Sequence, residues 1–182
     1  MILGYCLFGP DDDNYLIDEN STLDLCQNCG FLKDFHYHNP SYKVKRKMYD
    51  FFHPYDLGHL VSQRFREFCV RENYNAIQFK ELERSFGYYQ FFSESVVSFD
   101  AHRTGTEFDK LCTVCGNYEE TTGIKPPYLS HIEHPLDDGF YRTDIVFGSK
   151  NSKDSIIIVG PETHRKLKRE KMKGITYIPI ER

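Results

Sequence analysis

The chain has 182 residues, a formal net charge of −4 and 40% hydrophobic residues. This length is enough for one domain to bury a core of its own. The acidic balance argues against a dedicated nucleic-acid binder, because such proteins carry an excess of basic residues that displaces counterions from phosphate. We therefore expect one domain over residues 1–182, and we do not expect nucleic acid to be its partner.

The N-terminal segment does not have the pattern of a secretion signal. Its apolar run over residues 1–8 is short, lacks a basic start and is soon followed by Asp11, Asp12 and Asp13. No apolar stretch reaches the ~20 residues that a membrane helix needs. These features favour a cytoplasmic protein that does not enter a membrane. Cysteines stay reduced in that compartment, which leaves them available to bind a metal ion.

The clearest helical pattern covers residues 56–72. Apolar side chains recur there at helical spacing, polar side chains occupy the opposite side, and Asp56 suits the N-cap position. We expect one long helix with an apolar stripe formed by Leu57, Leu60, Val61, Phe65, Phe68 and Cys69.

Short runs of alternating or apolar residues predict strands on both sides of this helix. The expected strands cover residues 1–9, 76–82, 88–92 and 95–100. Their lengths and the turn residues between them favour a mainly antiparallel sheet.

The C-terminal segment, residues 141–182, predicts a strand–helix–strand unit. Its expected elements are strands over 142–147 and 155–159, a helix over 162–173 and a final strand over 175–180. The final strand should lie at a sheet edge, because Pro179 has no N–H to donate to a neighbour. A unit of this kind permits a right-handed crossover with parallel pairing.

Two short sequences share a C-x-x-C-G pattern, at residues 26–30 and 112–116. In each of these knuckles the spacing allows two thiolates to bind one ion, and the glycine permits a positive φ that turns backbone amides toward sulfur. Two knuckles in one chain are typical of a closed tetrahedral zinc site, which has no open coordination position and is therefore structural. The spacing does not distinguish zinc from iron. The predicted metal ligands are Cys26, Cys29, Cys112 and Cys115.

These elements together predict an α+β fold. It combines a mainly antiparallel sheet, one long helix, the C-terminal strand–helix–strand unit and a zinc-ribbon-like site made of four cysteines. The two remaining cysteines, Cys6 and Cys69, fall on apolar faces and are expected to be buried core thiols. Histidines near the knuckles offer alternative ligands for one cysteine or for a second site. They are His36, His38, His131 and His134.

The sequence lacks the motifs of common enzyme classes. It contains no G-x-S-x-G, H-E-x-x-H or P-loop pattern. A zinc deaminase needs an H-x-E sequence before its C-x-x-C, whereas His131-Ile132-Glu133 follows the second knuckle. We therefore do not expect an enzyme.

The paired knuckles and the C-terminal segment together resemble the double-CxxCG family of bacterial immunity proteins, which is associated with contact-dependent or polymorphic toxin systems. The resemblance implies a cytoplasmic, non-enzymatic protein that binds and neutralises a cognate protein toxin. The residues that carry it are Cys26, Cys29, Gly30, Cys112, Cys115 and Gly116, with 141–148, 156–159, Leu167 and 174–180.

Two other functions remain open at this point. One is a zinc-ribbon-like nucleic-acid-binding or adaptor protein, which would use the basic run Lys43–Lys47 and the basic residues around Lys168. The other is an enzyme that would use His131 or His134 at a second, open metal site.

Overall fold

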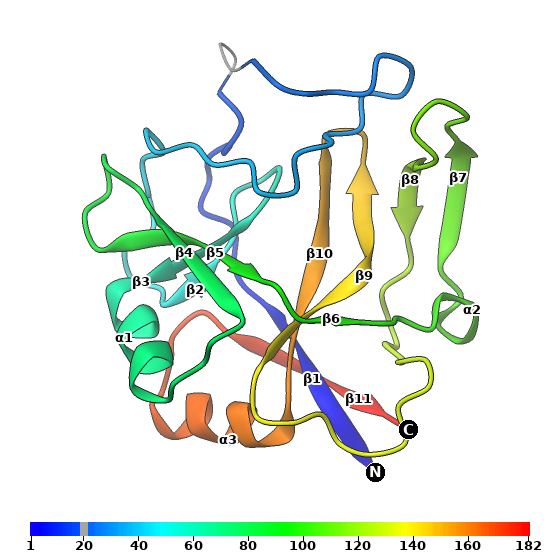
Figure 1. Ribbon diagram of the computed structural model, residues 1–182. Helices are drawn as coiled ribbons and strands as arrows, with labels where there is room; N and C mark the ends of the chain where they lie inside the picture. The colour runs from blue at the N-terminus through cyan, green and yellow to red at the C-terminus, as the bar shows by residue number, and fades with distance from the viewer. Residues whose placement is uncertain (19–21) are drawn as a thin grey trace.

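A computed structural model describes residues 1–18 and 22–182. The larger sheet has seven strands in the order β11-β1-β10-β9-β8-β7, with β6 paired in parallel to β9 (Figure 1). Apart from that pair, its strands run antiparallel. Its strands are β1 (Ile2–Phe8), β6 (Val96–Val97), β7 (Glu107–Leu111), β8 (Tyr118–Thr122), β9 (Phe140–Ser149), β10 (Ser152–Val159) and β11 (Thr176–Glu181).

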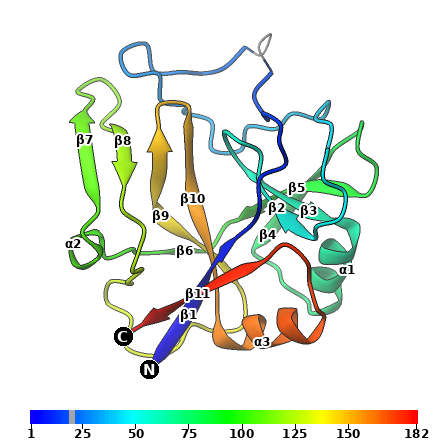
Figure 2. The same cartoon turned by 180° about the vertical axis from the view of Figure 1, so that it is seen from behind.

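A smaller antiparallel sheet has the order β2-β3-β5-β4 and lies beside β1 and β10, opposite the β7–β8 hairpin (Figures 1 and 2). Its strands are β2 (Phe51–Phe52), β3 (His59–Ser62), β4 (Ile77–Glu81) and β5 (Tyr88–Ser93). The helices are α1 (Gln63–Arg71), α2 (Ala101–Thr104) and α3 (Pro161–Arg169). The chain is therefore α+β and mostly antiparallel, as its sequence predicts.

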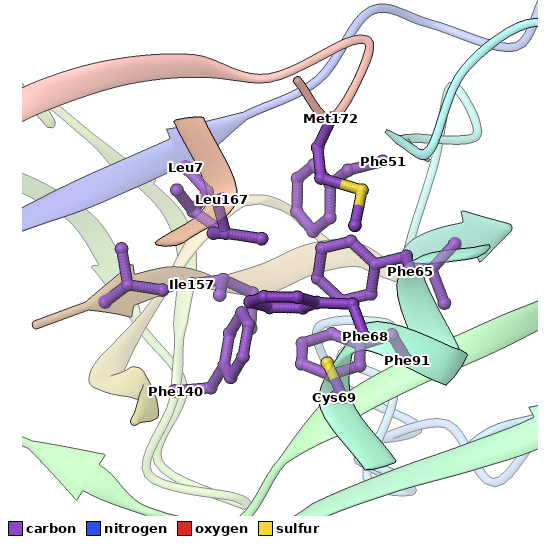
Figure 3. Packing of buried hydrophobic residues seen from close by; sticks show 12 residues of the cluster. Leu7, Phe51, Phe65, Phe68, Cys69, Phe91, Phe140, Ile157, Leu167 and Met172 are labelled. Atoms are coloured by element: carbon purple, nitrogen blue, oxygen red, sulfur yellow. The ribbon is translucent and has the colours of Figure 1, made fainter. Parts of the chain in front are cut away.

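The main core lies between the two sheets and both longer helices. Phenylalanines from α1, β2, β5 and β9 pack there against Leu7 of β1 and Ile157 of β10 (Figure 3). A second core covers the other face of the large sheet and includes Cys6, Ile156 and Ile158. Because neighbouring residues of a strand point to opposite faces, β1 and β10 contribute to both cores, which explains the unbroken apolar run of β10.

The long helix expected over residues 56–72 is wrong in its first half. Residues 59–62 form β3, and α1 covers only Gln63–Arg71, nine residues, the same length as α3. Gly58 has a φ of 89°, and the following residues pair with β2 and β5. Pairing with the phenylalanine-rich β5 therefore overrides a local helical spacing. The N-cap is Ser62, whose hydroxyl accepts a hydrogen bond from Phe65 N.

In the C-terminal segment, β10 is followed by α3 and then by β11. Direct parallel pairing of the two strands does not occur, because β1 lies between them and pairs antiparallel with each. The position of β1 between β10 and β11 depends on contacts between residues far apart in the chain, which the local sequence pattern does not encode. β11 ends the sheet order, and Pro179 lies opposite Tyr5.

None of the helices formed by the described residues combines the length and apolarity that a membrane crossing requires.

Candidate metal centre

The first knuckle is a tight turn in the loop before residue 35. Gly30 N donates to the carbonyl oxygen of Cys26 at 2.8 Å, and Cys26 N donates to that of Phe31 at 2.8 Å. Gly30 has a φ of 73°, which a residue with a side chain adopts only with strain. The turn leaves the side chains of Cys26 and Cys29 on one side of the loop, where both are buried.

The second knuckle has the same geometry at the tip of the β7–β8 hairpin. Gly116 N donates to Cys112 O at 2.8 Å, Cys112 N donates to Asn117 O at 2.8 Å, and Gly116 has a φ of 73°. The hairpin tip lies next to the loop of the first knuckle at one end of the large sheet (Figure 1). Two segments far apart in sequence thus present matching turns to each other.

The structure brings all four predicted ligands together. Their sulfur atoms lie within 4.8 Å of one another. Cys26 Sγ lies 3.7 Å from Cys112 Sγ, and Cys29 Sγ lies 3.5 Å from Cys115 Sγ. A zinc–sulfur bond of about 2.3 Å implies sulfur separations of about 3.8 Å around a tetrahedral ion, whereas a disulfide bond is about 2.05 Å. All four cysteines are free, so the cluster fits a tetrahedral metal ion.

The thiols of the cluster do not ionise equally. The Asn28 side-chain amide, 3.3 Å from Cys112 Sγ, and backbone amides of the second knuckle lower the pKa of Cys112 to about 6. Burial raises the pKa of Cys29 to about 12. Cys112 therefore loses its proton easily, whereas Cys29 needs a nearby cation to become a thiolate. Binding of a metal ion should therefore release protons from the cluster.

Lys153, on β10, supplies a positive charge beside the cluster. Its side chain is buried, and its Nζ donates to Tyr118 O at 2.8 Å and to Thr121 Oγ1 at 3.0 Å. In the described part of the chain it forms no ion pair with a carboxylate. Burial lowers the pKa of Lys153, while the negative charge of Cys29 and Cys115 opposes that shift. We infer that Lys153 offsets the negative charge of a four-thiolate site.

The alternative ligands do not join the cluster. Over residues 1–18 and 22–182, the four cysteines are the only group of three or more potential ligands with metal-binding spacing, so His131 and His134 belong to none. His38 Nε2 instead contacts Glu81 O at 2.9 Å, and His36 Nε2 lies 3.7 Å from a carboxylate oxygen of Glu94.

The two cysteines outside the cluster, Cys6 and Cys69, are fully buried in the two cores, as predicted.

The sequence analysis missed a histidine pair, in which His59 is buried and His53 is half-buried. His53 Nδ1 lies 3.2 Å from Gly58 O and 3.1 Å from His59 Nδ1, and His59 Nε2 lies 3.0 Å from Ser155 O. Carbonyl oxygens only accept, so His53 carries its proton on Nδ1 and His59 on Nε2. Both rings are therefore neutral, and burial lowers the pKa of each to about 4. The sequence pattern did not reveal this pair, because the helix expected over residues 56–72 included His59, whereas residues 59–62 form a strand paired with β2.

Comparison with protein-family models finds no match for the chain, and comparison with curated protein sequences finds none either.

Replacing Cys112 with Ser should remove the bound ion and lower the thermal stability, because three thiolates would then hold it and the two knuckles would separate. Elemental analysis of the purified protein should find one metal ion per chain in the wild type and a clear loss in C112S. The variant Cys69→Ala is the matched control, since it also removes a buried thiol but no ligand. An unchanged melting profile for C112S would contradict a structural ion.

Replacing Lys153 with Met should weaken metal binding by about ten- to hundredfold, the range found for partners that contact a ligand shell. Methionine keeps the apolar stem but removes the positive charge. Competition with a chromophoric chelator measures the affinity. Lys150→Met changes an exposed lysine of the nearby turn and should leave the affinity unchanged. Equal affinity in K153M and the wild type would show that Lys153 does not offset the cluster's charge.

Replacing His59 with Gln should make the protein less sensitive to mild acid. The unfolded chain takes up a proton near the ordinary histidine pKa of about 6.5, whereas His59 in the fold resists protonation down to about pH 4. The wild type should therefore lose about 2 kcal/mol more unfolding free energy than H59Q between pH 7 and pH 5. Urea titrations at both pH values measure this difference. The other titrating groups are shared by the two proteins, so their contributions to the unfolding free energy cancel. His102→Gln, at an exposed position, should follow the wild type.

Proposed function

We propose that the chain is an immunity-type protein that binds and neutralises a cognate bacterial toxin in the cytoplasm, and that its four cysteines hold a structural zinc ion. The observation that carries the proposal is the closed four-sulfur cluster. Four thiolates fill a tetrahedral coordination sphere, so the ion would have no position for a substrate or for an activated water. This supports a binding protein over an enzyme.

The cluster also lies where it can shape a binding surface. It would hold the loop of the first knuckle against the tip of the β7–β8 hairpin. Large apolar side chains on that hairpin face solvent, with exposed fractions of 40% for Phe108, 57% for Leu111 and 71% for Val114. Exposed apolar residues are typical of contact surfaces for other proteins when they form one patch, so this hairpin is the candidate contact surface. The resemblance to the double-CxxCG family supports a toxin as that protein.

The alternative of a nucleic-acid-binding or adaptor protein has less support. The lysines of one expected contact, the basic run Lys43–Lys47, are exposed, but Arg46 and Lys45 also contact the acidic segment. Arg46 forms an ion pair with Asp13, and Lys45 Nζ donates to Asp13 O at 2.6 Å. Asp12 is buried and accepts hydrogen bonds from Lys45 N and Arg46 N. Part of the charge that would attract phosphate is thus already neutralised within the chain.

The proposal is tested with the product of the gene directly upstream, since an immunity gene is expected to follow its toxin gene. Expression of that product alone should arrest growth, and co-expression of this protein should restore it. The purified proteins should elute together in size-exclusion chromatography. An upstream product that is harmless, or that does not bind this protein, would argue against the proposal.

Two variants make this test specific. Val114→Glu places a charge on the exposed hairpin tip without touching a sulfur ligand, so it should weaken the complex and leave the metal content intact. Val70→Glu is the matched control, because Val70 is 61% exposed on α1, away from the hairpin. Equal loss of binding in both variants would show that the hairpin tip is not the contact surface.

A further inference from the structure

A cavity of about 210 Å³ lies beside the histidine pair, on the face of the large sheet opposite the main core. It is lined by the end of β1, the loop before β3, the first half of β10 and the second half of β9. Its walls are partly apolar, with two aromatic rings, Phe8 and Phe147. Its polar lining comes from His53, Asp56, His59, Ser152, Asp154 and Ser155.

The Asp154 carboxylate in this lining has no positive partner among the described residues. Its Oδ2 accepts from Gly58 N at 2.8 Å and its Oδ1 accepts from Ser155 N at 2.7 Å, which leaves a lone pair on each oxygen. The nearest ionisable nitrogen is His59 Nε2 at 3.6 Å, and that ring is neutral. No described lysine or arginine forms an ion pair with Asp154. Burial raises the pKa of Asp154, because the desolvated carboxylate has no cation beside it among the described residues, and a bound cation would favour its charged form.

One other group extends the set of hydrogen-bond acceptors. With the proton of His53 on Nδ1, its Nε2 carries a lone pair, and the structure gives that atom no partner within the described residues. The cavity therefore offers a carboxylate and a nitrogen lone pair, and no described lysine or arginine forms an ion pair with that carboxylate.

The arrangement does not suit a metal ion. Its His and Asp side chains do not form a group of three or more ligand atoms with metal-binding spacing within residues 1–18 and 22–182. An organic cation fits better, because it can bring N–H donors to the acceptors and place an apolar body against the aromatic walls. A cavity of about 150 Å³ holds benzene, so this one has room for an aromatic ring with a short charged arm.

We propose that this cavity is a binding site for a primary ammonium group carried on an apolar body, with Asp154 as its anionic partner. Phe8 and Phe147 contact the apolar part. The site lies apart from the cysteine cluster and does not depend on the toxin-neutralising function. The same chemistry is found in a free organic amine and in a lysine side chain of another protein, and both are probed below.

The test uses the metal-loaded, full-length protein and isothermal titration calorimetry with benzylammonium. Benzyl alcohol and benzoate are the neutral and anionic controls, because they keep the ring and change only the charged group. Benzylammonium should bind at least about tenfold more tightly than either, the factor expected for a charged hydrogen bond. Nα-acetyl-lysine methylamide mimics a lysine side chain. Binding of benzylammonium alone identifies a free amine as the ligand, and binding of the lysine mimic identifies a protein side chain.

Three variants distinguish binding in the cavity from non-specific binding of a cation to an acidic surface. Asp154→Asn should weaken binding of the ammonium by about ten- to hundredfold. Ile124 also lines the cavity, so Ile124→Trp should block binding by filling it without altering the carboxylate. Asp109→Asn, an exposed acid on β7, should have no effect. Benzylammonium that binds no better than benzyl alcohol, or equally to the wild type and I124W, would overturn the proposal.

Discussion

The arrangement of this protein depends on bringing four sulfur atoms within 4.8 Å of one another. Such a cluster repels itself once its thiols ionise, so it needs a cation and nearby donors. The chain provides the same turn twice, an amide from Asn28 and a buried ammonium from Lys153. These contacts join the first loop to the tip of the β7–β8 hairpin. We therefore expect the surface at that end of the sheet to depend on closure of the cluster.

Burial of β10 on both faces connects the cluster to the cavity. Lys153 and Asp154 are neighbours in this strand, so their side chains point to opposite faces. The lysine lies beside the thiolates, and the aspartate lies beside the histidine pair. Within the described residues, neither forms an ion pair with a carboxylate, a lysine or an arginine. One strand thus carries a buried lysine beside the cysteine cluster and, on its other face, an aspartic acid whose pKa is raised by burial.

The pattern of residues in the sequence predicted the structure correctly where interactions between near neighbours in the chain decide it. The C-x-x-C-G sequences predicted which four cysteines come together, because a short turn alone places two sulfurs on one side. The spacing also identified most strands and the short helix α3. It misled at residues 56–62, where Leu60 and Val61 fit a helical stripe and a buried strand equally well. The β-sheet partner that decided between them lies beyond the helix, at Tyr88–Ser93.

The knuckles, the α+β class and the burial of Cys6 and Cys69 follow from the amino-acid sequence, because each depends on short-range turn geometry or on apolar periodicity. Long-range contacts, in contrast, place β1 between β10 and β11, bring Lys153 to the cysteines, and bring His53, His59 and Asp154 together around one cavity. The hydrogen bonds from Gly58 to Asp154 and from His59 to Ser155 each join residues 96 positions apart. Their energies depend on burial and on charge compensation, which no local pattern records.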